Sequence, residues 1–133
     1  MINPIATPKA PGAVGPYSQG IDTGSLVFAS GQLPLHPETK TMPADIREQA
    51  AQSLENLKAV LEAAGSGLDK VVKTSVFLAD LADFAAVNGE SKICIEFIYI
   101  EVICTFPDFL VWCKSDSHVA VLDFRVVDQI RNC

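Results

Sequence analysis

Two short polar clusters flank an apolar run near the start of the chain, and their residue types could bind a small molecule. Tyr17, in the cluster 15–19, combines an aromatic wall with a phenol hydroxyl, and Ser30 offers an orientable hydroxyl. Gly31, next to Ser30, would let the backbone approach a ligand closely. Each residue also has a structural reading, because Ser-Gly at a strand end is usually a turn and a Tyr after Gly-Pro is often a packed aromatic. The residues alone leave both readings open.

The four cysteines do not form a recognisable metal or disulfide pattern. They lie C-terminal to Glu90, at Cys94, Cys104, Cys113 and Cys133, and no two have the CxxC spacing of many zinc sites. A disulfide framework is not expected without a secretory signal. The positions favour buried free thiols, and the sequence predicts no metal site.

The composition indicates one globular domain over residues 1–133. Hydrophobic residues make up 49% of the chain and charged residues 20%, which is typical of a domain with a core. The net charge of -6 argues against a general nucleic-acid binder, because phosphate contacts need clustered Lys and Arg. The N-terminus shows no signal-peptide pattern, and no run reaches the roughly 18 apolar residues of a membrane span, so we expect a cytoplasmic protein.

The two polar clusters belong to a predicted β-hairpin. Residues 17–22 and 25–30 flank Thr23-Gly24 and have the pattern of two strands joined by a tight turn. The Pro- and Gly-rich segment 3–16 is expected to be an extended surface arm, and residues 33–43, which hold three prolines, are expected to be a loop.

A long helix is the clearest predicted element. Between Ala44 and Ala64 the apolar residues recur at spacings of three and four, which makes one helix face, and Gly65 suits a left-handed stop. The β-branched segment 71–78 is typical of a strand in the middle of a sheet. A second helix is expected to begin near Leu81 behind an Asp cap.

Beyond Glu90 the chain changes character, since all eight glycines precede that residue and all four cysteines follow it. Residues 91–104 fit a strand by propensity without excluding a helix, and 109–113 and 118–127 are expected to be two closing strands. The predicted fold class is therefore α+β, with two helices on one face of a mainly antiparallel or mixed sheet.

Two long stretches give the chain a resemblance to a known family. The segments "APGAVGPYSQGIDTGSLVFASGQLPLHPETK" (10–40) and "QAAQSLENLKAVLEAAGSGLDKVVKTSVFLADLADFAAVN" (49–88), in that order, closely resemble the RidA (YjgF) family of reactive intermediate deaminases. The resemblance covers about residues 5–90. It implies a chorismate-mutase-like protomer that assembles as a homotrimer with pockets at the subunit interfaces.

The resemblance also implies an activity. Family members of the closest type hydrolyse 2-iminobutanoate and 2-iminopropanoate to 2-oxo acids and ammonia, and they use no metal and no organic cofactor. Their substrates are enamine and imine species released by pyridoxal-phosphate-dependent dehydratases. Animal relatives have been described as translation inhibitors with ribonuclease activity on single-stranded RNA.

The resemblance assigns four residues to substrate binding. In the family, the positions that match Tyr17, Ser30, Gly31 and Asn88 line the interfacial pocket. The polar clusters would then lie at the ends of an apolar run because that strand end is the rim of a pocket. For Asn88, which precedes Gly89, the alternative is a helix C-cap.

The C-terminal third departs from the family pattern. Family deaminases carry an Arg just after a Phe-Pro, followed closely by Ser and Cys, and this Arg clamps the substrate carboxylate. Here Phe106-Pro107 is followed by Asp108, which would repel a carboxylate, and a bidentate guanidinium is hard to replace. Cys113 matches the family Cys if two residues are inserted. The family Glu that positions the hydrolytic water corresponds to Asp123 only with a one-residue slip, which reverses the facing of a strand.

Three explanations for residues 91–133 stay open: a truly diverged sequence, a frameshifted coding sequence, or a stretch whose residue identities were read imperfectly. The abrupt change of composition at Glu90 favours the second and third explanations.

Three functions follow, in decreasing order of support. The first is a 2-imino acid deaminase, supported by the first 90 residues. The second is a non-catalytic regulator that binds a small metabolite on the same trimer, favoured by the missing Arg. The third is RNA cleavage or translation inhibition, against which the net negative charge weighs.

Overall fold

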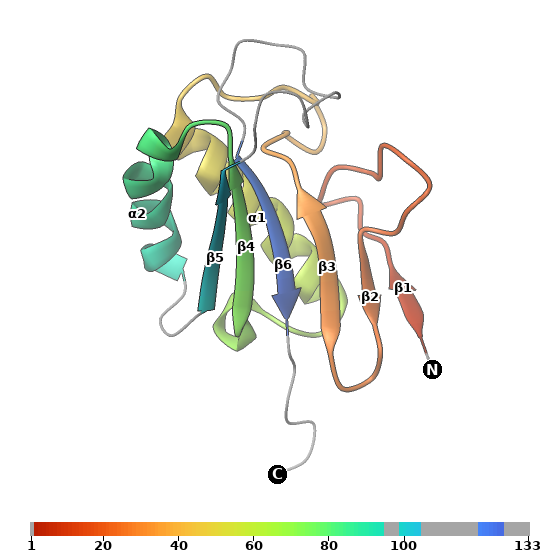
Figure 1. Ribbon diagram of the computed structural model, residues 1–133. Helices are drawn as coiled ribbons and strands as arrows, with labels where there is room; N and C mark the ends of the chain where they lie inside the picture. The colour runs from red at the N-terminus through yellow and green to blue at the C-terminus, as the bar shows by residue number, and fades with distance from the viewer. Residues whose placement is uncertain (1, 95–98, 105–119, 127–133) are drawn as a thin grey trace.

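The computed structural model describes residues 2–94, 99–104 and 120–126, which form a layered α+β domain (Figure 1). Two short 3-10 turns, Leu68–Lys70 and Leu81–Asp83, precede β4 and α2. The helices and strands follow one another as β1 (Asn3–Ile5), β2 (Gly20–Asp22), β3 (Val27–Gln32), α1 (Ile46–Ala63), β4 (Lys73–Leu78), α2 (Phe84–Cys94), β5 (Tyr99–Cys104) and β6 (Ala120–Val126).

The strands of the described residues form a six-stranded sheet in the order β1-β2-β3-β6-β4-β5. Neighbouring strands are antiparallel except β4 and β5, which are parallel because α2 carries the chain back between them. β6, the last strand along the chain, lies between β3 and β4 in the middle of the sheet (Figure 1). The expected mixed sheet, with 71–78 as one of its central strands, is confirmed.

α1 forms because its apolar face recurs at helical spacing and both of its ends are capped. Asp45 is the N-cap, and its carboxylate accepts hydrogen bonds from two backbone amides of the first turn (2.9 and 3.1 Å). At the other end Gly65 takes a φ of 75°, and the Ser66 amide donates to the Leu61 carbonyl (2.9 Å). The helix expected over 44–64 is confirmed.

The core lies between α1 and the sheet. α1 packs on β3, on β6 and on α2, so the two helices cover one face of the sheet (Figure 1). Neither helix of the described residues combines the length and the apolar character that a membrane span requires. The buried apolar cluster consists of Ile5, Ala10, Val27, Ala29, Ala50, Leu54, Leu57, Val60, Leu61, Val71, Val76, Leu78 and Val87.

The expectation of a surface arm over 3–16 is wrong for residues 3–10, whereas residues 12–16 are exposed and lie outside any strand. Asn3–Ile5 is a strand that pairs with β2, and both Ile5 and Ala10 are buried in the core cluster. The prolines misled the sequence reading, because β1 is an edge strand and an edge position tolerates the missing amide of Pro4.

The sequence left a strand or a helix open for residues 91–104, and the structure has both within this range. α2 continues to Cys94, and β5 begins at Tyr99. The strand expected over 118–127 is confirmed as β6, whereas the one expected over 109–113 lies outside the described residues.

Candidate active site

A small recess opens beside Tyr17, where the segment that leads to β2 meets the end of β3. Tyr17 and Gly31 both line it, whereas Ser30 does not, and substrate binding by these three residues stays a prediction. Its walls are two irregular segments, residues 11–14 before β2 and residues 33–35 after β3. The cavity volume is about 20 Å³, and a water molecule needs at least about 10–15 Å³. The recess therefore has room for about one water molecule and is too small for an imino acid.

Tyr17 lines this recess and is 48% exposed. Its hydroxyl oxygen accepts a hydrogen bond from the Val14 amide (3.3 Å), and its own amide donates to the Gly15 carbonyl (2.8 Å). These bonds fold the segment 14–17 into a tight turn. Within one chain Tyr17 is only partly packed, and its role in substrate binding stays a prediction.

Ser30 and Gly31 occupy an irregularity in β3. The register between β3 and β6 shifts between Ala29 and Gln32, so the two residues between them leave the regular ladder. Such bulges occur often next to active sites, because they free backbone groups and re-aim side chains. The Ser30 hydroxyl donates to the Ser18 carbonyl (2.6 Å), and the Ser30 amide donates to the Gln19 carbonyl (2.9 Å). Ser30 therefore ties the end of β3 to the segment that carries Tyr17.

Asn88 does not join the recess within one chain. It lies half-buried in the interior of α2, so the alternative of a helix C-cap is wrong. α2 lies at the opposite end of the sheet from β1 and β2 (Figure 1). A Cβ added at the neighbouring Gly89 would lie 3.9 Å from the Arg47 guanidinium, which places this part of α2 beside α1. Substrate binding by Asn88 stays a prediction.

Of the two site residues expected in the C-terminal third, the structure describes only Asp123. Asp123 lies in β6 and pairs in register with Ser75 of β4. Cys113 and Asp108 lie outside the described residues. Among residues 2–94, 99–104 and 120–126, no group of three His, Cys, Asp or Glu side chains gathers as metal ligands would.

Sequence reasoning missed two buried amides beside the recess, Gln19 and Asn56. The Gln19 side chain hydrogen-bonds to the segment 7–11, and the Asn56 side chain hydrogen-bonds to residues 33 and 35. The sequence did contain a signal for Asn56. Positions 49, 53, 56 and 60 of α1 form a second row at helical spacing, and this row contains polar residues but no charge. All four positions are buried.

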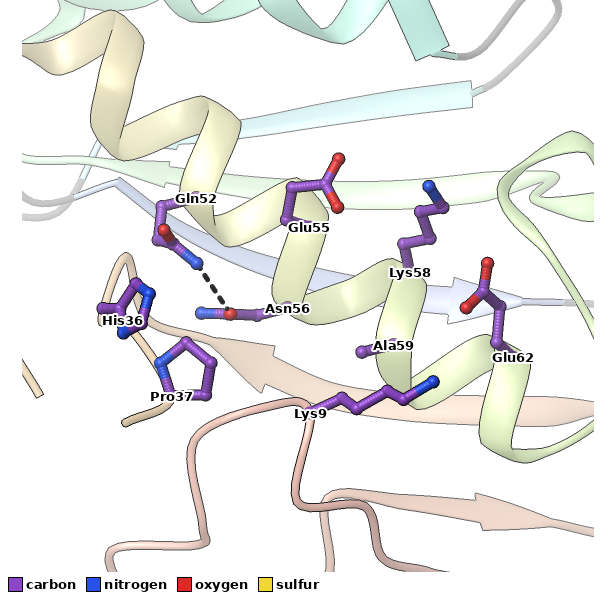
Figure 2. A pocket seen from close by; sticks show the side chains of 9 residues that line it. All are labelled: Lys9, His36, Pro37, Gln52, Glu55, Asn56, Lys58, Ala59 and Glu62. Atoms are coloured by element: carbon purple, nitrogen blue, oxygen red, sulfur yellow. Dashed lines mark hydrogen bonds between the residues drawn. The ribbon is translucent and has the colours of Figure 1, made fainter. Parts of the chain in front are cut away.

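A wider groove lies on the outer side of α1 and contains none of the expected site residues (Figure 2). Its volume is about 310 Å³, and its charged side chains include Lys9, Glu55, Lys58 and Glu62. Glu55, Lys58 and Glu62 recur at helical spacing on the exposed face of α1, as expected for a solvated helix surface. We assign no reaction to this groove.

Comparison with known proteins places the chain among the relatives that the sequence indicated. The sequence profile of the family described as Endoribonuclease L-PSP matches residues 7–96. The 2-iminobutanoate/2-iminopropanoate deaminase of Escherichia coli strain K12 is 49% identical over 107 residues, which cover 80% of each chain.

Two solved structures share the fold over nearly the whole chain. E. coli TdcF with bound serine has a TM-score of 0.81 and 37% identity, over 93% of this chain and 98% of that one. RidA from the Antarctic bacterium Psychrobacter sp. PAMC 21119 has a TM-score of 0.81 and 35% identity, over 94% and 98%. The expected RidA-type α+β protomer is confirmed.

Proposed function

Because the chain belongs to the family described as Endoribonuclease L-PSP, which includes the RidA (YjgF) proteins, we propose that it hydrolyses 2-imino acids to 2-oxo acids and ammonia. Its substrates would be 2-iminobutanoate and 2-iminopropanoate. The observation that carries the proposal is the 49% identity to the E. coli enzyme of that name over 80% of each chain. The residues matched by the family profile include Tyr17, Ser30 and Gly31.

The reaction asks little of the protein. Water adds to the carbon of the C=N bond and one of its protons moves to nitrogen, which gives a tetrahedral carbinolamine. The hydroxyl proton of this intermediate then moves to nitrogen as well, the C–N bond breaks, and ammonia leaves as the C=O bond forms. Imines undergo this hydrolysis unaided, so positioning a water and holding the substrate supply most of the acceleration. The recess beside Tyr17 fits this need, because its volume of about 20 Å³ suits about one water.

We further propose that the protein is a homotrimer with its substrate pockets between subunits. Three observations support this assembly. The recess alone cannot hold an imino acid, Asn88 lies at the other end of the sheet from Tyr17, and the described residues place both helices on one sheet face. On the uncovered face Phe28 is 38% exposed. Sedimentation equilibrium should give a trimer mass, and a stable monomer at micromolar concentration would contradict the assembly.

The proposal includes no metal and no organic cofactor. Turnover should therefore be unchanged in EDTA, and a loss that zinc restores would contradict this part. We also propose a cytoplasmic location, because the four cysteines lack the pattern of a disulfide framework and reduced thiols are typical of the cytosol.

The missing Arg gives the sharpest test of the proposed reaction. A charge-assisted hydrogen bond contributes about 1.5–3 kcal/mol, and each 1.4 kcal/mol is about tenfold in rate. With the tail as written, turnover of 2-iminobutanoate should be about ten- to a hundredfold weaker than in an Arg-bearing relative. A dehydratase would generate the imine in the assay, and semicarbazide trapping would follow its loss.

Mass spectrometry of the intact protein separates the two ways in which this test could fail. Full activity at the mass of the written sequence, 14.3 kDa, would contradict our account of the carboxylate clamp. Full activity at a different mass would instead show that residues 91–133 are not as written.

A second candidate function is non-catalytic binding of a small metabolite. It is favoured because Asp108 follows Phe106-Pro107, where family deaminases have the Arg that binds the substrate carboxylate. Calorimetric binding of 2-oxobutanoate without any imine turnover would support it. Endoribonuclease activity, which the family's description names, would be seen as RNA cleavage in a gel assay, and the net charge of -6 weighs against it.

A further inference from the structure

The first wall of the recess is held by the side chain of Gln19, which is only 6% exposed. Its Nε2 lies within hydrogen-bond reach of the carbonyl oxygens of Thr7 (3.1 Å), Ala10 (3.3 Å) and Pro11 (2.8 Å). Its Oε1 accepts from the Thr7 amide (2.6 Å). The segment 7–11 continues directly into residues 11–14, so the Gln19 side chain sets where that wall begins.

The second wall is held by Asn56 of α1, which is 1% exposed. Its Nδ2 donates to the carbonyl oxygens of Leu33 (2.9 Å) and Leu35 (2.8 Å), which both line the recess. Its Oδ1 accepts from Gln52 Nε2 (3.0 Å), and Figure 2 shows the two amides facing each other. This bond orients the Asn56 amide with its nitrogen toward the wall.

The two amides act on backbone that lies outside the regular strands. Carbonyl groups in such segments need partners when buried, and an unmade bond costs more than a made bond gains. A single amide that reaches two or three carbonyls therefore restricts the whole segment to one position. Leu or Met at either site would leave those carbonyls without that partner.

We propose that Gln19 and Asn56 are positioning residues of the recess, which act by fixing its two walls against Tyr17 and Gly31. This inference rests on the proposed function for its kinetic consequence. Gln19 itself lines the recess and Asn56 does not, but the proposed effect of both amides is on the position of the walls and requires no contact with the reacting atoms. Their effect on the reaction comes from the geometry of the walls, and a displacement of 1 Å at a site can cost about 100-fold in rate.

Gln49 provides a matched control on the same helix as Asn56. It is also a buried amide, with no exposed surface, and its Nε2 donates to a loop carbonyl, that of Pro43 (2.8 Å). Neither Gln49 nor Pro43 lines the recess. A replacement of Gln49 removes the same kind of bond away from the recess.

The kinetic test compares Gln19→Met, Asn56→Leu and Gln49→Met in the assembled protein. All three variants should unfold at a lower temperature than the wild type. Gln19→Met and Asn56→Leu should raise the KM for 2-iminobutanoate about tenfold, within the range that small displacements cost, while kcat falls less. Gln49→Met should leave KM within about twofold. An equal KM change in all three would overturn the proposal.

Hydrogen–deuterium exchange tests the same inference without any enzymatic activity. Gln19→Met should speed exchange in residues 7–14, Asn56→Leu in 33–35, and Gln49→Met in neither segment. If the wild type shows no imine turnover, the proposed function fails while this experiment still decides the positioning. Unchanged exchange in both walls would overturn it.

Gln52→Leu is a milder variant in case Asn56→Leu does not fold. Gln52 is half-buried on the surface of α1, and its loss keeps both bonds from Asn56 to the wall. Exchange in residues 33–35 should rise about two- to threefold, because the Asn56 amide loses one orienting bond of modest strength. No rise would count against the assignment of Asn56.

Discussion

The core beneath α1 is buried and the recess beside Tyr17 is partly exposed, and different interactions hold the two regions together. In the core, Leu57, Val60 and Leu61 have no exposed surface and pack against the sheet. Their contribution depends on buried area and shape and has no fixed direction. In the recess, the walls are held by the side-chain amides of Gln19 and Asn56, and a hydrogen bond requires a donor and an acceptor at a set distance and angle.

This difference predicts how the two regions respond to substitution. A core side chain can be exchanged for another of similar volume at small cost. A wall amide has no apolar substitute, because a replacement of equal size leaves buried or partly buried carbonyls without that partner. Core variants should therefore lose stability before activity, and recess variants should lose activity with little or moderate loss of stability.

The largest expected effect is that of Leu57→Ala in the core. Leu57 has no exposed surface, so truncation leaves a cavity, and the free energy of unfolding should fall by about 2–5 kcal/mol. Urea denaturation measures the change. The control is Leu81→Ala, at a side chain 58% exposed, which should change stability by less than about 0.5 kcal/mol. A loss below about 1 kcal/mol for Leu57→Ala would show that the core under α1 is not close-packed.

Gly20→Ala should have the next largest effect, because β2 passes close to the core. An added Cβ would lie 3.0 Å from the Phe28 carbonyl oxygen, 3.0 Å from Ile5 Cδ1 and 3.1 Å from Val60 Cγ1. We expect a loss of about 1–3 kcal/mol in a thermal or urea unfolding experiment. Gly12→Ala is the matched control, since its Cβ would meet nothing within 4 Å. Equal effects at both positions would contradict this packing.

Asp45→Ala should cost less, about 0.5–2 kcal/mol, because it removes the N-cap of α1 and leaves two amides of the first turn without that acceptor. Thermal unfolding gives the change. Asp45→Asn retains a capping oxygen and should recover most of the loss. The cap supports the core side of the molecule, so KM for the imine should be unchanged in both variants. A raised KM would show that the N-terminus of α1 affects the recess, and would contradict the distinction between core and recess variants.

Tyr17→Phe should have the smallest effect on stability, below about 0.5 kcal/mol, because the side chain is 48% exposed. It removes the hydroxyl that accepts from the Val14 amide at 3.3 Å and that stands at the recess. The proposed function predicts a two- to tenfold fall in kcat/KM, about the value of one net hydrogen bond. A stability loss with unchanged kcat/KM would place Tyr17 with the packed residues instead.

The regular elements could be predicted because each carries its own periodic signal. The apolar spacing of 44–64, the β-branched run 71–78 and the turn at Thr23-Gly24 correspond to α1, β4 and the β2–β3 hairpin. Tyr17 and Gly31 both line the recess, but the interfacial substrate pocket that the family resemblance implies for them stays a prediction. The role of Gln19 was not predicted, because its partners at 7–11 are held by bonds to backbone carbonyls, which every residue type presents alike.

By itself, the sequence determined the hairpin, α1, β4 and the second helix, since the periodic burial of apolar side chains is a local property of the chain. Only the tertiary structure decided that β6 enters the sheet between β3 and β4, that Ile5 and Ala10 belong to the core, and that Asn88 lies across the sheet from Tyr17. These features depend on contacts between residues far apart in the chain. Such contacts are selected by the free energy of the whole packed domain, and no short stretch of residues encodes them.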